Sequence, residues 1–194
     1  RAWQQGAGTR RAGGEGGNVG GTKWNLIDLW ARWVKAVRPD AAAIAAEEAR
    51  VETWWSESGG DDSRAWRVHD LLALMAGQRG DADAARRRFD DAIAAHPVRE
   101  LADPARHSGF QHLVNRAAMQ RLASDGVAAA RDWATDLLAK DARFHVFWSA
   151  PWDERLEPKE RTRLTEAVVK AYERRLKAFP AERERIEAEL SRLR

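Results

Sequence analysis

Residues 66–97 read WRVHDLLALMAGQRGDADAARRRFDDAIAAHP, and this stretch predicts two helices joined by a tight turn. Gly80 favours the end of the first helix, Asp81 the N-cap of the second, and Pro97 its termination. Apolar residues recur three and four positions apart on both sides of the turn, as they do on the buried face of a helix. They are Trp66, Leu71, Leu72 and Met75 before the turn, and Ala85, Phe89, Ala92 and Ile93 after it. The stretch therefore predicts an antiparallel helical pair.

This pair resembles a tetratricopeptide repeat, a helix–turn–helix unit of about 34 residues. The resemblance rests on Leu72, Ala73, Gly80, Asp81, Ala85, Phe89, Ala92, Ile93 and Pro97. It implies that Ala73 and Ala85 let the two helices approach closely, and that Phe89 fills the gap toward the next pair. The sequence departs from the family at His69 and Ala76, where a large aromatic residue is expected, so the first helix packs atypically.

Similar helix-capping and helix-ending residues occur on both sides of this stretch. We expect a Gly-rich disordered linker over residues 1–21 and a helical-repeat domain over 22–194. The domain divides into a Trp-rich pair (22–58), the repeat with its candidate cap at Ser63 (63–97), a degenerate repeat (109–142), and a C-terminal pair with a polar cap (158–194). Because paired amphipathic helices cannot close a core alone, the pairs must stack. The expected fold is all-α, a short right-handed α-solenoid of tetratricopeptide type, with an unrelated helical bundle as the alternative.

Composition narrows the class of protein. The chain has 194 residues, ten Trp, no Cys and a net charge of +3. Without Cys it has no disulfide framework and no thiolate metal site. No run approaches the roughly 18 apolar residues of a membrane-spanning helix, so we expect a soluble, cytoplasmic protein. The chain begins at Arg1 rather than Met, which suggests a missing N-terminus or the C-terminal part of a longer protein.

Candidate catalytic chemistry is sparse. The five His residues lack HExxH spacing and are interpreted as surface or capping residues: His69, His96, His107, His112 and His145. Adjacent carboxylates such as Asp90 and Asp91 diverge on a helix and do not converge on one substrate. Arg86, Arg87 and Arg88 form a basic triplet that we interpret as a solvated face, with a phosphate or RNA contact as the alternative. We therefore expect no catalytic residues, no cofactor and no metal.

The tryptophans allow two interpretations. Six of the ten lie between residues 24 and 66. They form either a Trp-rich core or an aromatic patch for a partner, in which case Trp24, Trp54 and Trp55 would reach the surface. Trp148 and Trp152, on either side of Pro151, raise the same question.

The tetratricopeptide resemblance implies a peptide-binding groove lined by the first helix of each pair. Carried over to matching positions, it predicts Arg67, Asp70, Leu74 and Gln78, and by weaker matching His112, Asn115 and Met119. The expected function is a non-catalytic protein–protein interaction module that binds a peptide or partner helix. The first alternative is a helical accessory segment of a larger enzyme or sensor, packing on a preceding domain through its Trp-rich pair. A weaker alternative is nucleic-acid binding through the basic C-terminal helices, which the slightly acidic body does not favour. The sequence does not indicate an oligomeric state.

Overall fold

The computed structural model describes residues 19–37, 40–59, 65–97 and 107–194, and all regular structure within these ranges is helical. Nine α-helices and a short 3₁₀ turn, η4 (Pro180–Glu182), follow one another along this part of the chain. The helices are α1 (Val19–Val37), α2 (Ala41–Glu57), α3 (Ala65–Arg79), α4 (Ala82–Ala95), α5 (His107–Ser124), α6 (Val127–Lys140), α7 (Ala150–Asp153), α8 (Pro158–Ala178) and α9 (Arg183–Leu193).

The residues that cap and end the helices agree closely with the sequence prediction. The Asp81 carboxylate accepts a hydrogen bond from the amide of Ala84 at 2.9 Å, so Asp81 is the predicted N-cap of α4. Gly80 precedes it with a φ of 86°, a left-handed conformation that favours glycine. One boundary differs, because α1 begins at Val19, inside the segment predicted as linker. Residues 1–18 and Ser63 lie outside the described residues.

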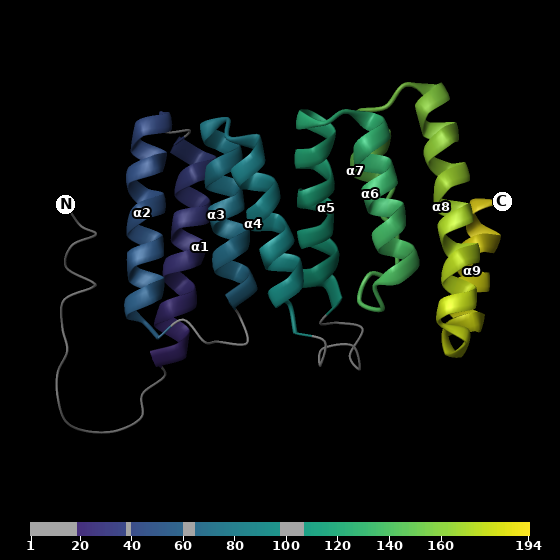
Figure 1. Cartoon of the computed structure of the whole chain (residues 1–194), viewed down its shortest axis with the longest axis horizontal. Coiled ribbons are helices and arrows are strands. Elements are labelled where there is room, and N and C mark those ends of the chain that lie inside the picture. Colours follow the sequence, from purple (N-terminus) through teal and green to yellow (C-terminus); the bar gives the residue numbers. More distant parts are fainter. Residues whose placement is uncertain (1–18, 38–39, 60–64, 98–106) are drawn as a thin grey trace.

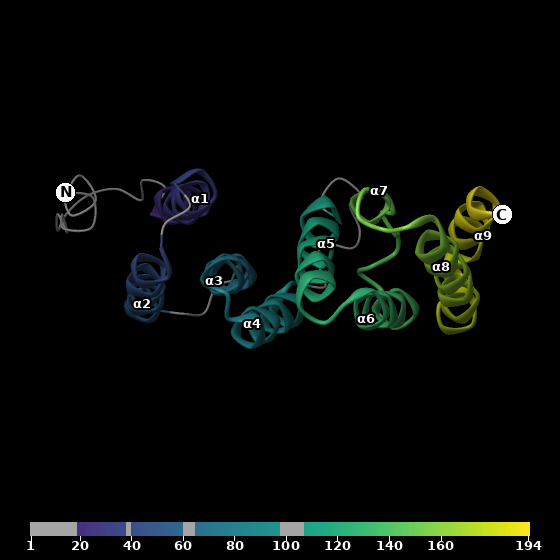
Figure 2. The ribbon, with the colours of Figure 1, turned by 90° about the horizontal axis from the view of Figure 1, so that it is seen from above.

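The helices form an elongated row (Figure 1). Figure 2 shows α1, α5 and α7 toward one side of this row, and α2, α4 and α6 toward the other. Most helices pack against their neighbours in the chain, and α3 with α4 form the most extensive contact. There are two exceptions: α1 packs mainly on α3, and α6 packs mainly on α8, because α7 is a single short turn placed against α5. The predicted helical pair at residues 66–97 is therefore the closest-packed pair of the molecule's described part.

Small residues explain that close packing. Ala73 of α3 and Ala85 of α4 are completely buried, as predicted for the positions where the two helices meet. Phe89 is also buried and belongs to a cluster that includes Phe110, Leu113 and Ala117 of α5. The side chain thus connects the pair to the next helix, as the sequence predicted.

Two hydrophobic clusters meet at α3. The N-terminal cluster joins α1, α2 and α3, with Val34, Ile44 and Val51 nearly or completely buried. The C-terminal cluster begins at Ala73 of α3 and continues through α9. Because opposite faces of α3 serve the two clusters, this helix lacks the strongly one-sided polarity of a surface helix.

The side chain of Trp30 on α1 contacts side chains of α2. α1 packs most closely on α3, and its contact with α2 runs through the buried indole of Trp30. The ring of Trp30 meets that of Trp54 edge to face at 5.5 Å, and its Nε1 donates to Glu47 at 3.3 Å. Trp33, Trp54 and Trp55 are half-buried against the same cluster.

His96 was predicted to be a surface or capping residue, and it lies at the end of a helix but not at the surface. It occupies the C-cap position of α4 but is buried, with its ring 4.7 Å from that of Trp66 and 4.8 Å from that of Phe110. These tilted and edge-on ring contacts place the imidazole between α3 and α5. Sequence spacing does not show this, because Phe110 lies beyond the intervening loop.

The C-terminal cluster contains the chain's single tyrosine. Tyr172 is buried, its hydroxyl accepts from the amide of Phe147 at 3.0 Å, and it donates to the carbonyl of His145 at 3.4 Å. Burial raises the pKa of Tyr172 to about 12, although the bond from Phe147 opposes that shift.

We expect the stability of the protein to fall as pH rises from about 10 to about 12. Over this range the unfolded chain ionises its tyrosine while the folded chain keeps the proton, so alkali favours unfolding. Tyrosinate absorbance measures this directly, since no second tyrosine interferes, and native and urea-unfolded protein should titrate with clearly separate midpoints. Tyr172→Phe is the control for stability, and equal midpoints in both states would contradict the prediction.

Candidate functional site

Two hollows adjoin along α3 and α5 and form one groove. The larger hollow has a volume of about 650 Å³, within the range of small-ligand and peptide pockets. Its lining comes from α3, α4, α5 and the segment around α7: Ala73, Leu74, Gly77, Gln78, Phe89, His112, Asn115, Arg116, Met119, Gln120, Ala123, Trp148, Pro151 and Arg155. The smaller hollow, of about 100 Å³, lies between α1, α3 and α5. Leu74 and Arg116 line both hollows, so the two lie next to each other, and together they are called the groove.

The structure places all seven predicted groove residues in the linings of these two hollows. Leu74, Gln78, His112, Asn115 and Met119 line the larger hollow. The remaining two predicted residues, Arg67 and Asp70, line the smaller one. The α5 residues lie three and four positions apart, which places them along a single helical face.

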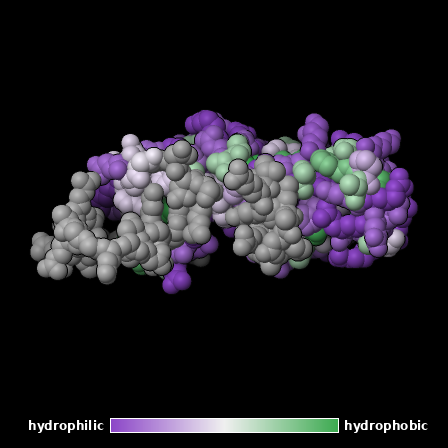
Figure 3. Space-filling view, turned by 90° about the horizontal axis from the view of Figure 1, so that it is seen from below, coloured by the Kyte–Doolittle hydropathy of each residue, from purple (hydrophilic) through white to green (hydrophobic). Residues whose placement is uncertain are grey.

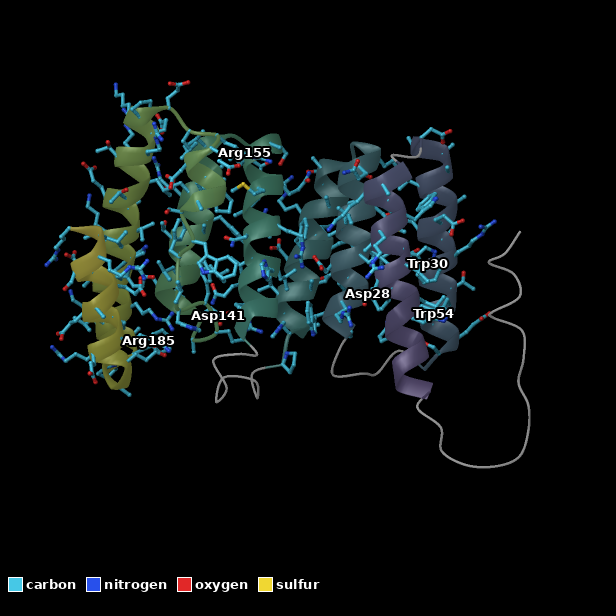
Figure 4. All side chains as sticks on the ribbon, turned by 180° about the vertical axis from the view of Figure 1, so that it is seen from behind. Asp28, Trp30, Trp54, Asp141, Arg155 and Arg185 are labelled. Carbon is cyan, nitrogen blue, oxygen red and sulfur yellow. The ribbon has the colours of Figure 1, made fainter. Side chains whose placement is uncertain are left out.

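Salt bridges link the helices beneath the groove. The Arg116 guanidinium of α5 donates to both carboxylate oxygens of Asp70 on α3, at 2.9 and 2.5 Å. Arg67 of α3 pairs with Asp28 of α1, which Figure 4 labels on that helix. Arg67 and Asp70 therefore link α3 to α1 and to α5. The charges of both residues are already paired within the protein, with Asp28 and Arg116 respectively.

An aromatic wall closes one part of the groove. The ring of Trp148 meets that of His112 edge to face at 4.9 Å, and Pro151 and Arg155 continue this wall. Trp148, Pro151 and Arg155 were not among the predicted groove residues, whereas His112 was. The paired Trp148 and Trp152 were the available signal, and the structure separates them, since Trp152 is completely buried and Trp148 only half-buried.

Gly77 allows a close contact at the floor of the groove. A Cβ at this position would lie 2.8 Å from the Oε1 of Gln120 on α5. A larger residue would therefore displace the Gln120 side chain, which lines the same hollow. The glycine brings α5 side chains close to α3 at the cost of some helix stability.

The predicted aromatic patch is not a continuous exposed surface in the described residues. Trp54 and Trp55 are half-buried against the N-terminal cluster, and the side chain of Trp24 lies outside the described residues. The large hydrophobic side chain that is clearly exposed in this part of the chain is Leu29 of α1, at 48%. On the face shown in Figure 3, hydrophilic residues cover most of the described surface and hydrophobic residues form small separate patches.

Charged residues on the opposite side of the row pair with one another. Arg86 bonds to Asp83 and, at 2.8 Å, to Asp125, while Arg88 pairs with Glu52.

Among the described residues, no group of three or more His, Cys, Asp or Glu side chains could hold a metal ion. Within the same residues no helix has the length and apolar content needed to cross a membrane. The comparisons with known proteins found no matching family model, no matching curated protein and no matching solved structure.

Proposed function

We propose that this chain is a non-catalytic interaction module that binds a peptide or partner helix in the groove along α3 and α5. The observation that supports the proposal is the groove itself, because Leu74, Gln78, His112, Asn115 and Met119 line one hollow of about 650 Å³. Its half-buried Leu74 and Met119 offer apolar contact, and the amides of Gln78 and Asn115 offer hydrogen bonds to a peptide backbone.

The same proposal includes the finer fold assignment. A right-handed solenoid of tetratricopeptide type would place the first helix of each pair along the binding side. The burial of Ala73, Ala85, Phe89 and Ala92 supports this assignment for α3 and α4. The half-buried His69 supports the expected departure from the family on the first helix.

A random dodecapeptide display library selected on the full chain tests the proposal. We expect selected synthetic peptides to lose about tenfold or more in affinity for the double variant Leu74→Ala/Met119→Ala, because interface energy concentrates in a few apolar anchors. Fluorescence polarisation measures the affinities, and circular dichroism checks that each variant folds. The matched control, Leu29→Ala/Leu137→Ala, truncates two side chains that do not line this groove. Unchanged affinity for the groove variant would contradict the proposal.

A second candidate function is packing of α1 and α2 on another domain of a larger protein. Exposure of Leu29 at 48% favours it, because a large aliphatic side chain on α1 lies open to contact. The test is to substitute Leu29→Asp in a longer form of the protein and to measure whether the other domain still packs on α1 and α2. Loss of packing would support this candidate, and unchanged packing would contradict it.

A further inference from the structure

The larger hollow of the groove has an unusual charge distribution. Its lining includes the guanidinium groups of Arg116 and Arg155 and the imidazole of His112, but no carboxylate. The hollow between α2 and α4 differs, because Glu48, Glu52, Asp90 and Asp91 line it together with Arg79, Arg87 and Arg88. Since acidic residues are common in this chain, with 30 Asp and Glu in all, their absence from the lining of the larger hollow distinguishes it from the smaller one, which Asp28 and Asp70 line.

The two arginines of the larger hollow, Arg116 and Arg155, differ in whether they form an ion pair. Arg116 is held by both oxygens of Asp70. The side chain of Arg155 forms no ion pair or hydrogen bond with the residues that the structure describes, and it is exposed. Between these two arginines, Arg155 therefore supplies the positive charge of the larger hollow that no carboxylate of the described residues compensates.

The position of Arg155 is well defined by the backbone. Its amide donates to the carbonyl of Trp152 at 2.9 Å, and the Trp152 side chain is completely buried in the C-terminal cluster. Figure 4 shows Arg155 near the upper ends of α5 and α7. A cation on this turn stands beside the apolar part of the groove, where Leu74, Met119 and Trp148 are half-buried.

The dimensions suit a short protein segment. His112 and Ala123 mark the span of α5 along the hollow, and eleven residues of helix rise about 16 Å. An extended segment of about five residues, or about three turns of helix, covers this length. The amides of Asn115 and Gln120 lie within the span and can bond to the segment's backbone.

We propose that the groove selects an acidic protein segment, with a carboxylate that pairs with Arg155 and an apolar side chain that contacts Leu74 and Met119. This inference rests on the proposed function and adds the chemistry of the partner. The apolar walls favour a protein segment over a nucleic acid, whose backbone presents phosphates without aliphatic side chains. The charge asymmetry favours acidic over basic segments, because a partner's Lys or Arg would find no carboxylate in this hollow.

The experiment uses the dodecapeptides selected on the full chain. We expect them to contain Asp or Glu, and to lose about tenfold in affinity for Arg155→Glu. Replacing the peptide's acidic residue by Lys should restore binding to Arg155→Glu and weaken binding to the native chain. The matched control is Arg87→Glu, which makes the same charge change at an exposed arginine of the hollow between α2 and α4. Its affinity should equal that of the native chain.

Two results would overturn the acidic-segment inference while leaving the proposed function in place. One is peptides that need Leu74 and Met119 but contain no acidic residue. The other is equal affinity for Arg155→Glu and Arg87→Glu. Binding of oligo(dT) that Arg155→Glu abolishes, with no acidic peptide selected, would also overturn the inference in favour of nucleic acid. Peptides insensitive to Leu74→Ala/Met119→Ala would instead contradict the proposed function.

Discussion

Replacing Arg175 by Leu is expected to lower the free energy of unfolding by about 3–5 kcal/mol, the largest loss that we predict for a single charged residue. The Arg175 side chain is completely buried although it carries a charge. Its Nη1 donates to the carbonyls of Leu138, Asp141 and Phe144 at 2.8, 2.7 and 3.0 Å. Its Nη2 donates to the carbonyl of Ala142 at 3.0 Å.

The loss is large because the partners of Arg175 cannot be removed with it. A buried ion pair between two side chains can sometimes be replaced by apolar residues at little cost. Here most acceptors are backbone carbonyls of the segment that joins α6 to α7, and a leucine would leave them without this donor. Glu182, which accepts from Nε and Nη2 at 3.0 and 2.9 Å, would also lose its closest buried counter-charge.

Urea denaturation followed by circular dichroism measures the effect. The matched control is Arg174→Leu at the neighbouring position, where the side chain is 54% exposed, lies 3.8 Å from Asp136 and forms one long hydrogen bond, of 3.4 Å, to the carbonyl of Thr135. We expect that control to cost less than about 1 kcal/mol. Equal losses for the two variants would show that the carbonyl contacts of Arg175 contribute little.

Phe89→Ala is expected to cost about 3–5 kcal/mol, because it removes a large side chain from a packed core. Phe89 is only 4% exposed and belongs to the C-terminal cluster with Phe110, Leu113 and Ala117 of α5. Truncation would leave a cavity at the junction between the α3–α4 pair and α5. The same urea denaturation measures the loss.

The conservative variant Phe89→Leu provides the control for this prediction. It keeps most of the volume and should cost less than about 1.5 kcal/mol. A loss below about 1 kcal/mol for Phe89→Ala would mean that the junction can collapse around the smaller residue. That outcome would also contradict the role that the tetratricopeptide resemblance implies for this position.

The C-terminal cluster illustrates where sequence reasoning missed a residue. The apolar spacing over residues 158–179 predicts one buried face, made of Leu164, Val168, Ala171, Tyr172, Leu176 and Phe179. The first four are buried, and Leu176 and Phe179 are half-buried. Arg175 lies on the same face, four positions after Ala171, but a hydrophobic pattern passes over an arginine. The signal that could have found it is the run of acceptors in the segment after α6, which has no regular structure to satisfy its carbonyls.

Much of the groove could be anticipated, but its chemistry could not. The tetratricopeptide resemblance implied Leu74, Gln78, His112, Asn115 and Met119 as groove residues, and all five line the larger hollow. Trp148 and Arg155 were missed because they follow a stretch without helical periodicity and reach the groove only through the placement of α7.

The sequence by itself determined the helical class, most helix boundaries and the cap at Asp81. These features depend on interactions within about four residues, so local spacing and turn residues suffice to predict them. The tertiary structure decided which charges form ion pairs: it joins Asp70 to Arg116, and it places Arg155 at the larger hollow, whose lining contains no carboxylate. The physical reason is that these contacts join residues far apart along the chain, whose proximity depends on how whole helices pack.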